Sequence, residues 1–217
     1  MSARLFDPAV ARRAARDLAA RDPQLAPLIR AGGPLRLPVR APGGVFGFLV
    51  RAVVFQQLAA PAASAIHRRV TRALGDGRGR ITPDAVLSGL SRRRRALGVS
   101  GPKTRTLLAL AEAAADEGLS TAALSRLSDE AIVERLTRIP GIGPWTAEMV
   151  LIFHLGRPDV LPATDLGIRY GVALLHGETS AWPPRRVLEH GERWRPWRSA
   201  AAWWLWCARS GARPGMD

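Results

Sequence analysis

The sequence is poor in cysteine, and Cys207 is its only one. A single cysteine excludes an internal disulfide, a cysteine-ligated zinc site and a four-cysteine iron–sulfur cluster. The four histidines are scattered along the chain without the spacing of metal ligands. We therefore expect no dedicated metal centre and no required cofactor.

The chain also lacks any apolar run close to the roughly 20 residues that a membrane-spanning helix needs. Its first residues, Met1–Pro8, contain no apolar core of the kind that precedes a signal-cleavage site. We expect a cytoplasmic protein with no membrane partner. The 217 residues suffice for one large domain or two small ones, and a hydrophobic content of 47% predicts a folded chain.

Acidic residues are scarce, with 18 Asp and Glu against 32 Lys and Arg, which gives a net charge of +14. Lys103 is the only lysine, and a bias in genome composition would explain why arginine replaces lysine. Such a bias does not explain the shortage of acids. A surface of this charge gains free energy by releasing counterions from a polyanion, so the composition favours a nucleic-acid partner.

The spacing of apolar residues, together with capping residues, predicts an all-α fold. The segment 7–30 is predicted to form a helix that Asp7 caps and Pro23 interrupts. Further helices are expected to begin near Phe46, Pro61, Thr82, Ser128, Pro144 and Asp165, with another through Leu107–Ala114. Residues 32–44 are too rich in Gly and Pro for a helix and predict an extended connection, in which 35–40 is the one candidate strand.

A short turn, Pro140–Gly143, separates two of the predicted helices. Gly141 and Gly143 permit a positive φ and leave backbone N–H groups uncovered, and such amides at a helix start attract phosphate. Read alone, these residues fit an ordinary helix–helix turn equally well. Further along, Thr164 and Asp165 are rival N-cap residues for the next helix, inside an apolar neighbourhood.

Five blocks of the sequence, in this order and spacing, resemble the helix-hairpin-helix DNA glycosylases of the 3-methyladenine DNA glycosylase II family. The resemblance covers roughly residues 24–209. The blocks are Phe48–Gln57, Ala96–Lys103, Ile139–Ala147, Arg157–Asp165 and Trp194–Ser199. The residues before Phe46 are too few for the N-terminal sheet domain of the family's longer members, so the resemblance implies a compact form.

The resemblance implies two helical subdomains that flank a cleft. We expect a central subdomain at 45–160, which contains the hairpin at 137–145. Residues 161–217 would complete the second subdomain together with the N-terminal segment 1–44.

The function that the resemblance implies is DNA repair on double-stranded DNA. Such enzymes flip an alkylated base of the 3-methyladenine or 7-methylguanine type out of the duplex and hydrolyse its N-glycosidic bond, which leaves an abasic site. Asp165 matches the family's catalytic aspartate, whose carboxylate stabilises the oxocarbenium-like sugar or orients the attacking water. Trp145 occupies the position of the lysine that lets related enzymes cut the strand, so we expect a monofunctional enzyme.

Several other positions match the family's binding residues. Trp145, Trp206 and Met149 match the base pocket, where an aromatic face can stack on an electron-poor purine. Gln57 or Leu58 matches the wedge that enters the gap left by the flipped base, although a plain helix-ending loop is the alternative. Tryptophans at this density are commonly core residues, and we expect this of Trp194, Trp197 and Trp203.

The hairpin and its surroundings match the family's contacts to the DNA backbone. The residues concerned are Gly141 and Gly143 in the hairpin and Thr146 just after it, with Lys103 and Arg105 as candidate phosphate contacts. The run Arg92–Arg95 is predicted to be a solvated face, with contact to DNA as the alternative. The family's hairpin also binds a sodium or potassium ion through backbone carbonyls, which here match Thr137, Ile139 and Ile142.

Other functions share some of these features. A non-catalytic helix-hairpin-helix module would need the charge and the hairpin but neither a pocket nor Asp165. A glycosylase of the same fold could act on mismatched adenine or oxidised bases, and an RNA-binding or ribosome-binding protein would explain the charge alone. On the glycosylase interpretation we expect a monomer associated with the nucleoid.

Overall fold

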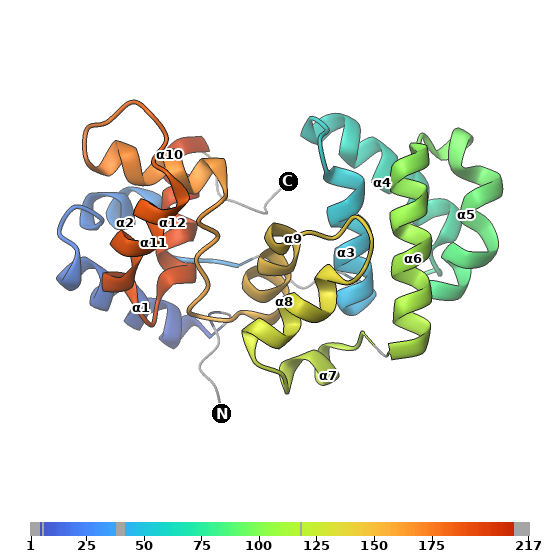
Figure 1. Cartoon of the computed structure of the whole chain (residues 1–217), viewed down its shortest axis with the longest axis horizontal. Coiled ribbons are helices and arrows are strands. Elements are labelled where there is room, and N and C mark those ends of the chain that lie inside the picture. The colour runs from blue at the N-terminus through green and yellow to red at the C-terminus, as the bar shows by residue number, and fades with distance from the viewer. Residues whose placement is uncertain (1–4, 6, 38–41, 118, 211–217) are drawn as a thin grey trace. The chain divides into compact units, whose positions relative to one another are not determined.

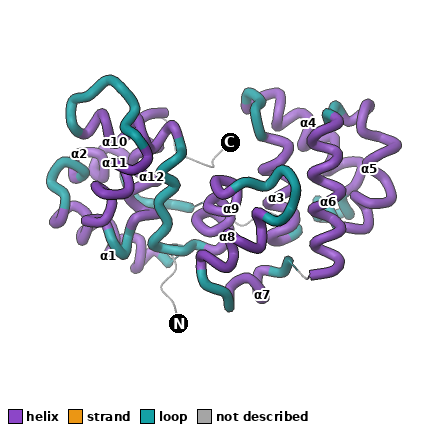
Figure 2. Tube along the Cα trace, in the orientation of Figure 1, coloured by secondary structure: helices purple, strands orange, loops and turns teal. Residues whose placement is uncertain are grey.

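The computed structural model describes residue 5 and residues 7–37, 42–117 and 119–210, which are the basis of every structural statement below. These residues form helices and loops, with no β-strand among them (Figure 1, Figure 2). The nearest approach to a sheet in this part of the chain is one isolated antiparallel bridge between Gly75 and Ile81. The predicted all-α fold is confirmed.

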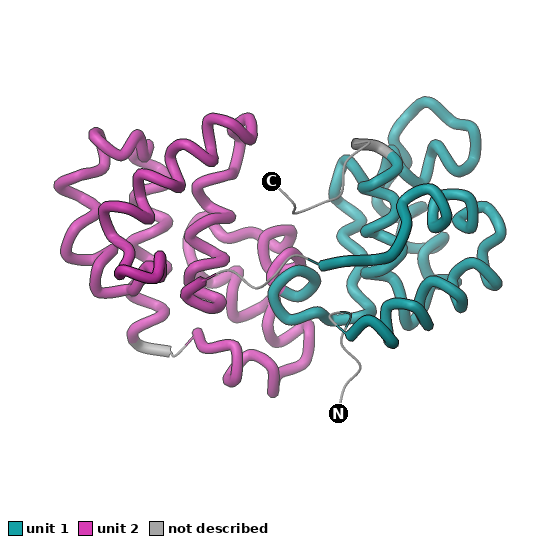
Figure 3. The backbone as a smooth tube through the Cα atoms, turned by 180° about the vertical axis from the view of Figure 1, so that it is seen from behind, with its two compact units in different colours: residues 1–38, 151–217 teal, residues 39–150 magenta. Residues whose placement is uncertain are grey.

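The chain divides into two compact units (Figure 3). Residues 1–38 and 151–217 form unit 1, and residues 39–150 form unit 2. The sequence places the corresponding boundaries near 45 and 160.

Unit 1 is built from helices at both ends of the chain. These are α1 (Pro8–Arg21), α2 (Ala26–Gly32), α10 (Leu166–Leu175), α11 (Pro184–Gly191) and α12 (Arg198–Ser210). A 3₁₀ turn, Glu192–Trp194, precedes α12. Helix α12 packs against α1, α2 and α10, and its tryptophans Trp203 and Trp204 are fully buried there. Trp194 and Trp197 are buried in the same core, so the core role predicted for three tryptophans is confirmed.

Unit 2 contains the helices around the predicted hairpin. They are α3 (Gly44–Phe55), α4 (Ala60–Leu74), α5 (Pro83–Leu97), α6 (Gly101–Glu117), α7 (Thr121–Ser125), α8 (Asp129–Thr137) and α9 (Pro144–Met149). The apolar stripe of α3, which includes Leu49, Val50 and Val53, is completely buried. The long helix α6 packs against α3 and α5 (Figure 1).

Local sequence rules explain where most of these helices begin. The Asp7 carboxylate accepts a hydrogen bond from the Ala9 amide at 2.7 Å and caps α1. The hydroxyls of Thr82 and Ser128 accept the corresponding bonds at the starts of α5 and α8. Each of these caps satisfies an amide that the helix itself leaves without a partner.

Three expectations need correction. Helix α7 was not predicted, because its five residues are too few to show a periodic apolar stripe. The helix after the hairpin was expected to run to Leu155, but its α-helical part ends at Met149 and the π-helical turn Val150–Leu155 follows. Residues 35–37 of the candidate strand form no strand, and residues 38–40 lie outside the described part of the chain.

No helix in the described part of the chain is both long enough and apolar enough to span a membrane.

Candidate active site

Asp165 lies directly before α10 and caps it. Its Oδ1 accepts a hydrogen bond from the Ile168 amide at 2.9 Å. Thr164, the rival candidate for this cap, is exposed. The same Oδ1 accepts a second hydrogen bond from the indole Nε1 of Trp206, also at 2.9 Å. Two donors from different helices therefore hold this half-buried carboxylate in one orientation.

Trp206 is the tryptophan of α12 that is only partly buried. Its indole ring lies against Phe153, with ring centroids 5.5 Å apart and planes inclined by 30°. The contact to Phe153 and the bond to Asp165 restrain the ring in two directions. An aromatic side chain held in this way next to a carboxylate suits a site that binds a flat, electron-poor base.

Gly167 makes room for this pair of side chains. A Cβ atom at position 167 would lie 2.9 Å from Asp165 Oδ1 and 3.0 Å from Trp206 Cδ1. Both distances are shorter than ordinary van der Waals contacts. Glycine in the first turn of α10 is unfavourable for the helix by about 0.5–1 kcal/mol relative to alanine, and here it lets the indole reach the carboxylate.

The hairpin between α8 and α9 packs against α6. Gly141 has a φ of 86°, which favours glycine, and a Cβ at this position would collide with Thr106 of α6. Both the backbone conformation and the lack of space therefore require glycine here. The Ile142 amide donates to the Ile139 carbonyl at 3.0 Å and closes the turn. Gly143 precedes α9, and no side chain in the described structure caps that helix start.

The loop after α3 is tied to the hairpin. Gln56 Nε2 donates to the Gly141 carbonyl oxygen at 3.3 Å. Gln57, which follows, has a φ of 55° and is the only described non-glycine residue with a positive φ. Gln57 and Leu58 are both exposed, so the structure places both wedge candidates on a surface loop that the hairpin supports.

Lys103 supports the same loop from α6. Its Nζ donates to the Val54 carbonyl at 2.7 Å, near the C-terminal end of α3. Burial lowers the pKa of this half-buried ammonium below its ordinary value. Arg105, the other candidate phosphate contact on α6, is exposed.

The remaining candidates for base and backbone binding lie in unit 2. Trp145 is 41% exposed at the start of α9, whereas Met149 and the Thr146 side chain are buried. Asp165 and Trp206 belong to unit 1. The structure thus brings Trp206 to Asp165 within one unit and carries Trp145, Met149 and the hairpin in the other.

The residues matched to the monovalent ion site surround the hairpin turn. Thr137 ends α8, and Ile139 and Ile142 are joined by the hydrogen bond that closes the turn. A carbonyl oxygen has two lone pairs, so Ile139 can accept this bond and still face a cation. Among the described residues, no group of three or more His, Cys, Asp or Glu side chains is placed to hold a metal ion.

Comparison with known proteins decides which of the candidate functions applies. No model of a protein family matches the chain. The DNA-3-methyladenine glycosylase 1 of Schizosaccharomyces pombe is 43% identical over 159 residues, which are 73% of this chain and 69% of that protein. The chain belongs to the DNA-3-methyladenine glycosylase family.

Two solved structures of the glycosylase family resemble the whole fold. The Schizosaccharomyces pombe 3-methyladenine DNA glycosylase in complex with abasic DNA is 38% identical, with a TM-score of 0.80, and the match covers 90% of this chain and 95% of that one. A DNA-3-methyladenine glycosidase from Bacillus halodurans is 31% identical with the same TM-score, over 96% and 92% of the two chains. Membership of the glycosylase family confirms the resemblance that the five sequence blocks indicate.

Sequence reasoning missed three residues of the candidate site. Gln56 and Phe153 were not singled out, and Gly167 was passed over as part of a helix. Gln56 lies 85 residues from its partner Gly141, a separation at which no local pattern indicates a contact. Gly167 did carry a signal, because a glycine inside the first turn of an apolar helix commonly marks a close approach.

Proposed function

We propose that the chain is a monofunctional DNA repair glycosylase that excises alkylated bases of the 3-methyladenine and 7-methylguanine type from double-stranded DNA. The observation that carries this proposal is the Asp165 carboxylate, held by the Ile168 amide and the Trp206 indole in a chain of the glycosylase family. Hydrolysis of the N-glycosidic bond releases the base and leaves an abasic site.

Asp165 supplies the charge that the reaction needs. Departure of the base leaves oxocarbenium-like positive charge on the sugar, and a carboxylate near C1′ stabilises that charge. Stabilisation of this kind is strongest when the charged group is already oriented before the reaction. The two hydrogen bonds to Oδ1 supply this orientation and favour electrostatic stabilisation as the main role of Asp165.

Cleavage of the N-glycosidic bond needs only modest stabilisation from the protein when the base is alkylated. An alkylated purine carries a positive charge and is a good leaving group, so binding the flipped base is the larger task. The residues that we assign to binding the flipped base are Trp206 of unit 1 and Trp145 and Met149 of unit 2. The two indole faces attract a cationic base through cation–π interactions.

Unit 2 would hold the duplex. The backbone amides of the hairpin, at Gly141, Gly143 and Thr146, would bind a phosphate, and Lys103 and Arg105 would support them. Gln57 or Leu58 would fill the gap left by the flipped nucleotide.

A sodium or potassium ion at the carbonyls of Thr137, Ile139 and Ile142 would add positive charge beside this phosphate. We expect the enzyme to act as a monomer on nucleoid DNA.

The decisive experiment is to measure release of free 3-methyladenine, 7-methylguanine and hypoxanthine from treated duplexes by the purified protein. We expect release of the two methylated bases, and loss of release by about 100-fold or more in Asp165→Asn, with duplex binding within a few-fold of wild type. Asp7→Asn is the matched control, because Asp7 also caps a helix of unit 1 and asparagine caps equally well. Absence of release by the wild-type protein, or full activity of Asp165→Asn, would contradict the proposal.

A further inference from the structure

The positive charge of unit 2 is concentrated on one pair of helices. Residues 60–97, which form α4, α5 and their connecting loop, contain nine arginines and two acidic residues and carry a net charge of +7. The rest of unit 2, residues 39–59 and 98–150, contains seven basic and seven acidic residues and is neutral. The segment that contains the hairpin therefore has no net charge of its own.

Most arginines of this helix pair are exposed and form no described ion pair. Eight of the nine are exposed, and Arg94 is partly buried. Among the described ion pairs, the one formed within this pair of helices joins Arg80 to Asp76 at 2.7 Å. The other hydrogen bonds of these arginines go to backbone carbonyls, which do not neutralise a guanidinium.

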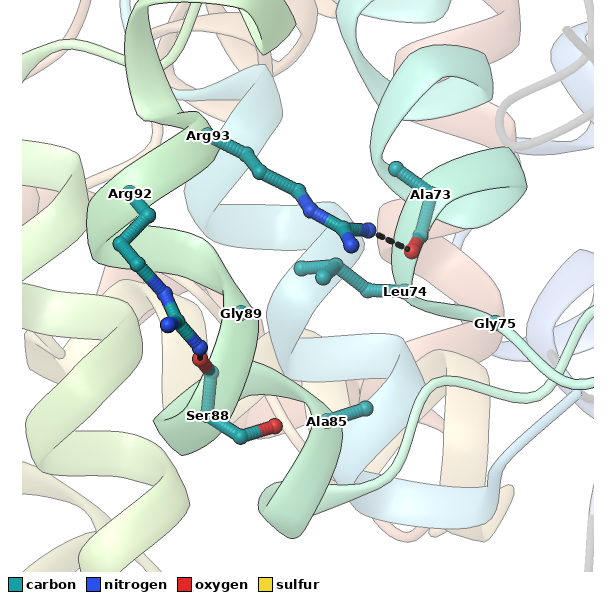
Figure 4. A pocket seen from close by; sticks show the side chains of 8 residues that line it. All are labelled: Ala73, Leu74, Gly75, Ala85, Ser88, Gly89, Arg92 and Arg93. Carbon is teal, nitrogen blue, oxygen red and sulfur yellow. Dashed lines mark hydrogen bonds between the residues drawn. The ribbon is translucent and has the colours of Figure 1, made fainter.

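Two of these backbone contacts are visible in Figure 4. Arg93 reaches from α5 across to α4 and donates to the Ala73 carbonyl at 2.9 Å, which fastens the two helices together. Arg92 lies along α5 and donates to the Ser88 carbonyl at 2.8 Å.

A hollow of about 280 Å³ lies between α4 and α5 beside these two arginines. Its lining consists of Ala73, Leu74, Gly75, Ala85, Ser88, Gly89, Arg92 and Arg93. Most of these side chains are small, so they do not obstruct the approach of a bulky polyanion to the guanidinium groups.

We propose that the helix pair α4–α5 is a second contact surface for the DNA backbone, distinct from the hairpin. The inference rests on the proposed function, because the polyanion that a base-excising enzyme must bind is duplex DNA. The hairpin would bind phosphate through backbone amides at short range, whereas eight arginines for which no carboxylate partner is described attract a duplex over about a Debye length. The α4–α5 surface supplies most of the salt-dependent, sequence-independent affinity of unit 2.

The contacts of α6 link the α4–α5 surface to the hairpin. Helix α5 packs against α6, and the hairpin packs against Thr106 of the same helix α6. Helix α6 therefore contacts both the hairpin and α5 within unit 2. Each base-pair step of a duplex adds two negative charges per about 3.4 Å, so the base pairs that flank the hairpin contact supply phosphates for a second contact surface.

The test compares two variants that each replace four exposed arginines. The first changes to glutamine four exposed arginines of the α4–α5 surface that have no described hydrogen bond or ion pair to another helix: Arg68, Arg72, Arg92 and Arg95. The matched control changes four exposed arginines of unit 1 to glutamine: Arg12, Arg16, Arg30 and Arg36. A third variant replaces the first set by lysine and keeps the charge.

Duplex affinity is measured over a range of salt concentrations for all variants. We expect the slope of log affinity against log salt to fall by about two to four units in the first variant, because each phosphate that a protein neutralises contributes about 0.9 to the slope. The unit 1 control should change the slope by less than about one unit, and the lysine variant should restore it. A slope that is unchanged in the first variant, or that changes equally in the control, overturns the proposal.

Excision separates this inference from the proposed function. Base release by the wild-type protein tests the proposed function by itself, and the salt slope of the first variant tests the α4–α5 surface. A wild-type protein that releases no base refutes the proposed function, whereas an active protein with an unchanged salt slope refutes only the α4–α5 surface. Thermal melting of each variant verifies that it is folded.

Discussion

The indole nitrogen of Trp206 donates to the Asp165 carboxylate at 2.9 Å, across 41 residues of sequence. Trp206 would bind the flipped base, and Asp165 would stabilise the positive charge on the sugar. Their contact makes Trp206 a positioning residue for Asp165 as well as a candidate wall of the pocket.

Replacing Trp206 by phenylalanine separates these two roles. Phenylalanine keeps an aromatic face but loses the N–H donor, and a hydrogen bond to a charged group contributes about 1.5–3 kcal/mol. We expect kcat for excision to fall by about 10–100-fold with KM nearly unchanged. Trp204→Phe is the matched control in the same helix, because its indole donates to the Gly33 carbonyl instead. Near-normal kcat in Trp206→Phe would mean that the ring serves only for stacking.

Gly167→Ala tests the hydrogen bond from Trp206 to Asp165 by adding a methyl group beside it. Alanine should favour α10 by about 0.5–1 kcal/mol, yet its Cβ would lie 2.9 Å from Asp165 Oδ1 and push the indole away. We expect excision to fall by about 10-fold while the melting temperature changes by only a few degrees. Gly77→Ala, where a Cβ meets no atom within 4 Å, should leave activity intact. Full activity of Gly167→Ala would show that the site accommodates the displacement.

Gln57 offers a test of the wedge. A left-handed backbone costs a residue with a side chain about 1–2 kcal/mol, and glycine adopts it freely. Gln57→Gly should therefore leave the free energy of unfolding unchanged or raise it slightly, while affinity for abasic duplex falls by about 10-fold because nothing fills the gap. Leu58→Gly is the comparison variant. A larger loss of abasic-duplex affinity in Leu58→Gly would identify Leu58 as the wedge.

His190 predicts how stability depends on pH. Its ring is buried in unit 1 among His176, Trp182 and Trp194, and its Nε2 lies 3.5 Å from Asp22 Oδ2. Burial, assisted by the positive charge of Arg193, lowers its pKa to about 4, although Asp22 opposes the shift. In the unfolded chain the pKa returns to about 6.5.

Between these two pKa values the unfolded chain binds more protons than the folded one. Protonation of His190 therefore does not reduce the free energy of unfolding above about pH 6.5. As the pH falls toward 4, it reduces this free energy by up to about 3 kcal/mol. We expect urea unfolding of wild type between pH 7 and 4.5 to show this loss and His190→Gln to show a flatter profile. Identical profiles for the two proteins would show that His190 does not contribute.

Much of the fold follows from local rules in the sequence. The caps at Asp7, Thr82, Ser128 and Asp165 were all predictable, because an N-cap needs only a suitable side chain beside the first helical turn. The core tryptophans were predictable from size and apolarity. Asp165 itself was identified through the block it belongs to and not through its chemistry alone.

The details that make the site were not predictable in the same way. The bond from Trp206 to Asp165 and that from Gln56 to Gly141 join distant segments, and only packing of the helices brings these residues together. The positive φ of Gln57 is imposed by the loop and not by the residue, since glutamine does not favour it.

Lys103 decides whether the enzyme also cuts the strand. A glycosylase that nicks DNA needs an amine to attack C1′ and form a Schiff base, and a lysine with a lowered pKa suits this task. Lys103 is the only lysine of the chain, and burial lowers its pKa. Its Nζ, however, donates to the Val54 carbonyl at 2.7 Å and so supports the loop after α3. We therefore expect water, not an amine, to complete the reaction.

The measurement treats a damaged duplex with enzyme and borohydride, which traps a Schiff base as a covalent protein–DNA adduct. We expect no adduct and no strand break before alkali in wild type. Lys103→Arg keeps the charge and a donor to the Val54 carbonyl, so it should retain base excision within about 10-fold, since only the loop support is perturbed. An adduct that forms in wild type and disappears in Lys103→Arg would make Lys103 a nucleophile and the enzyme bifunctional, because arginine cannot form a Schiff base.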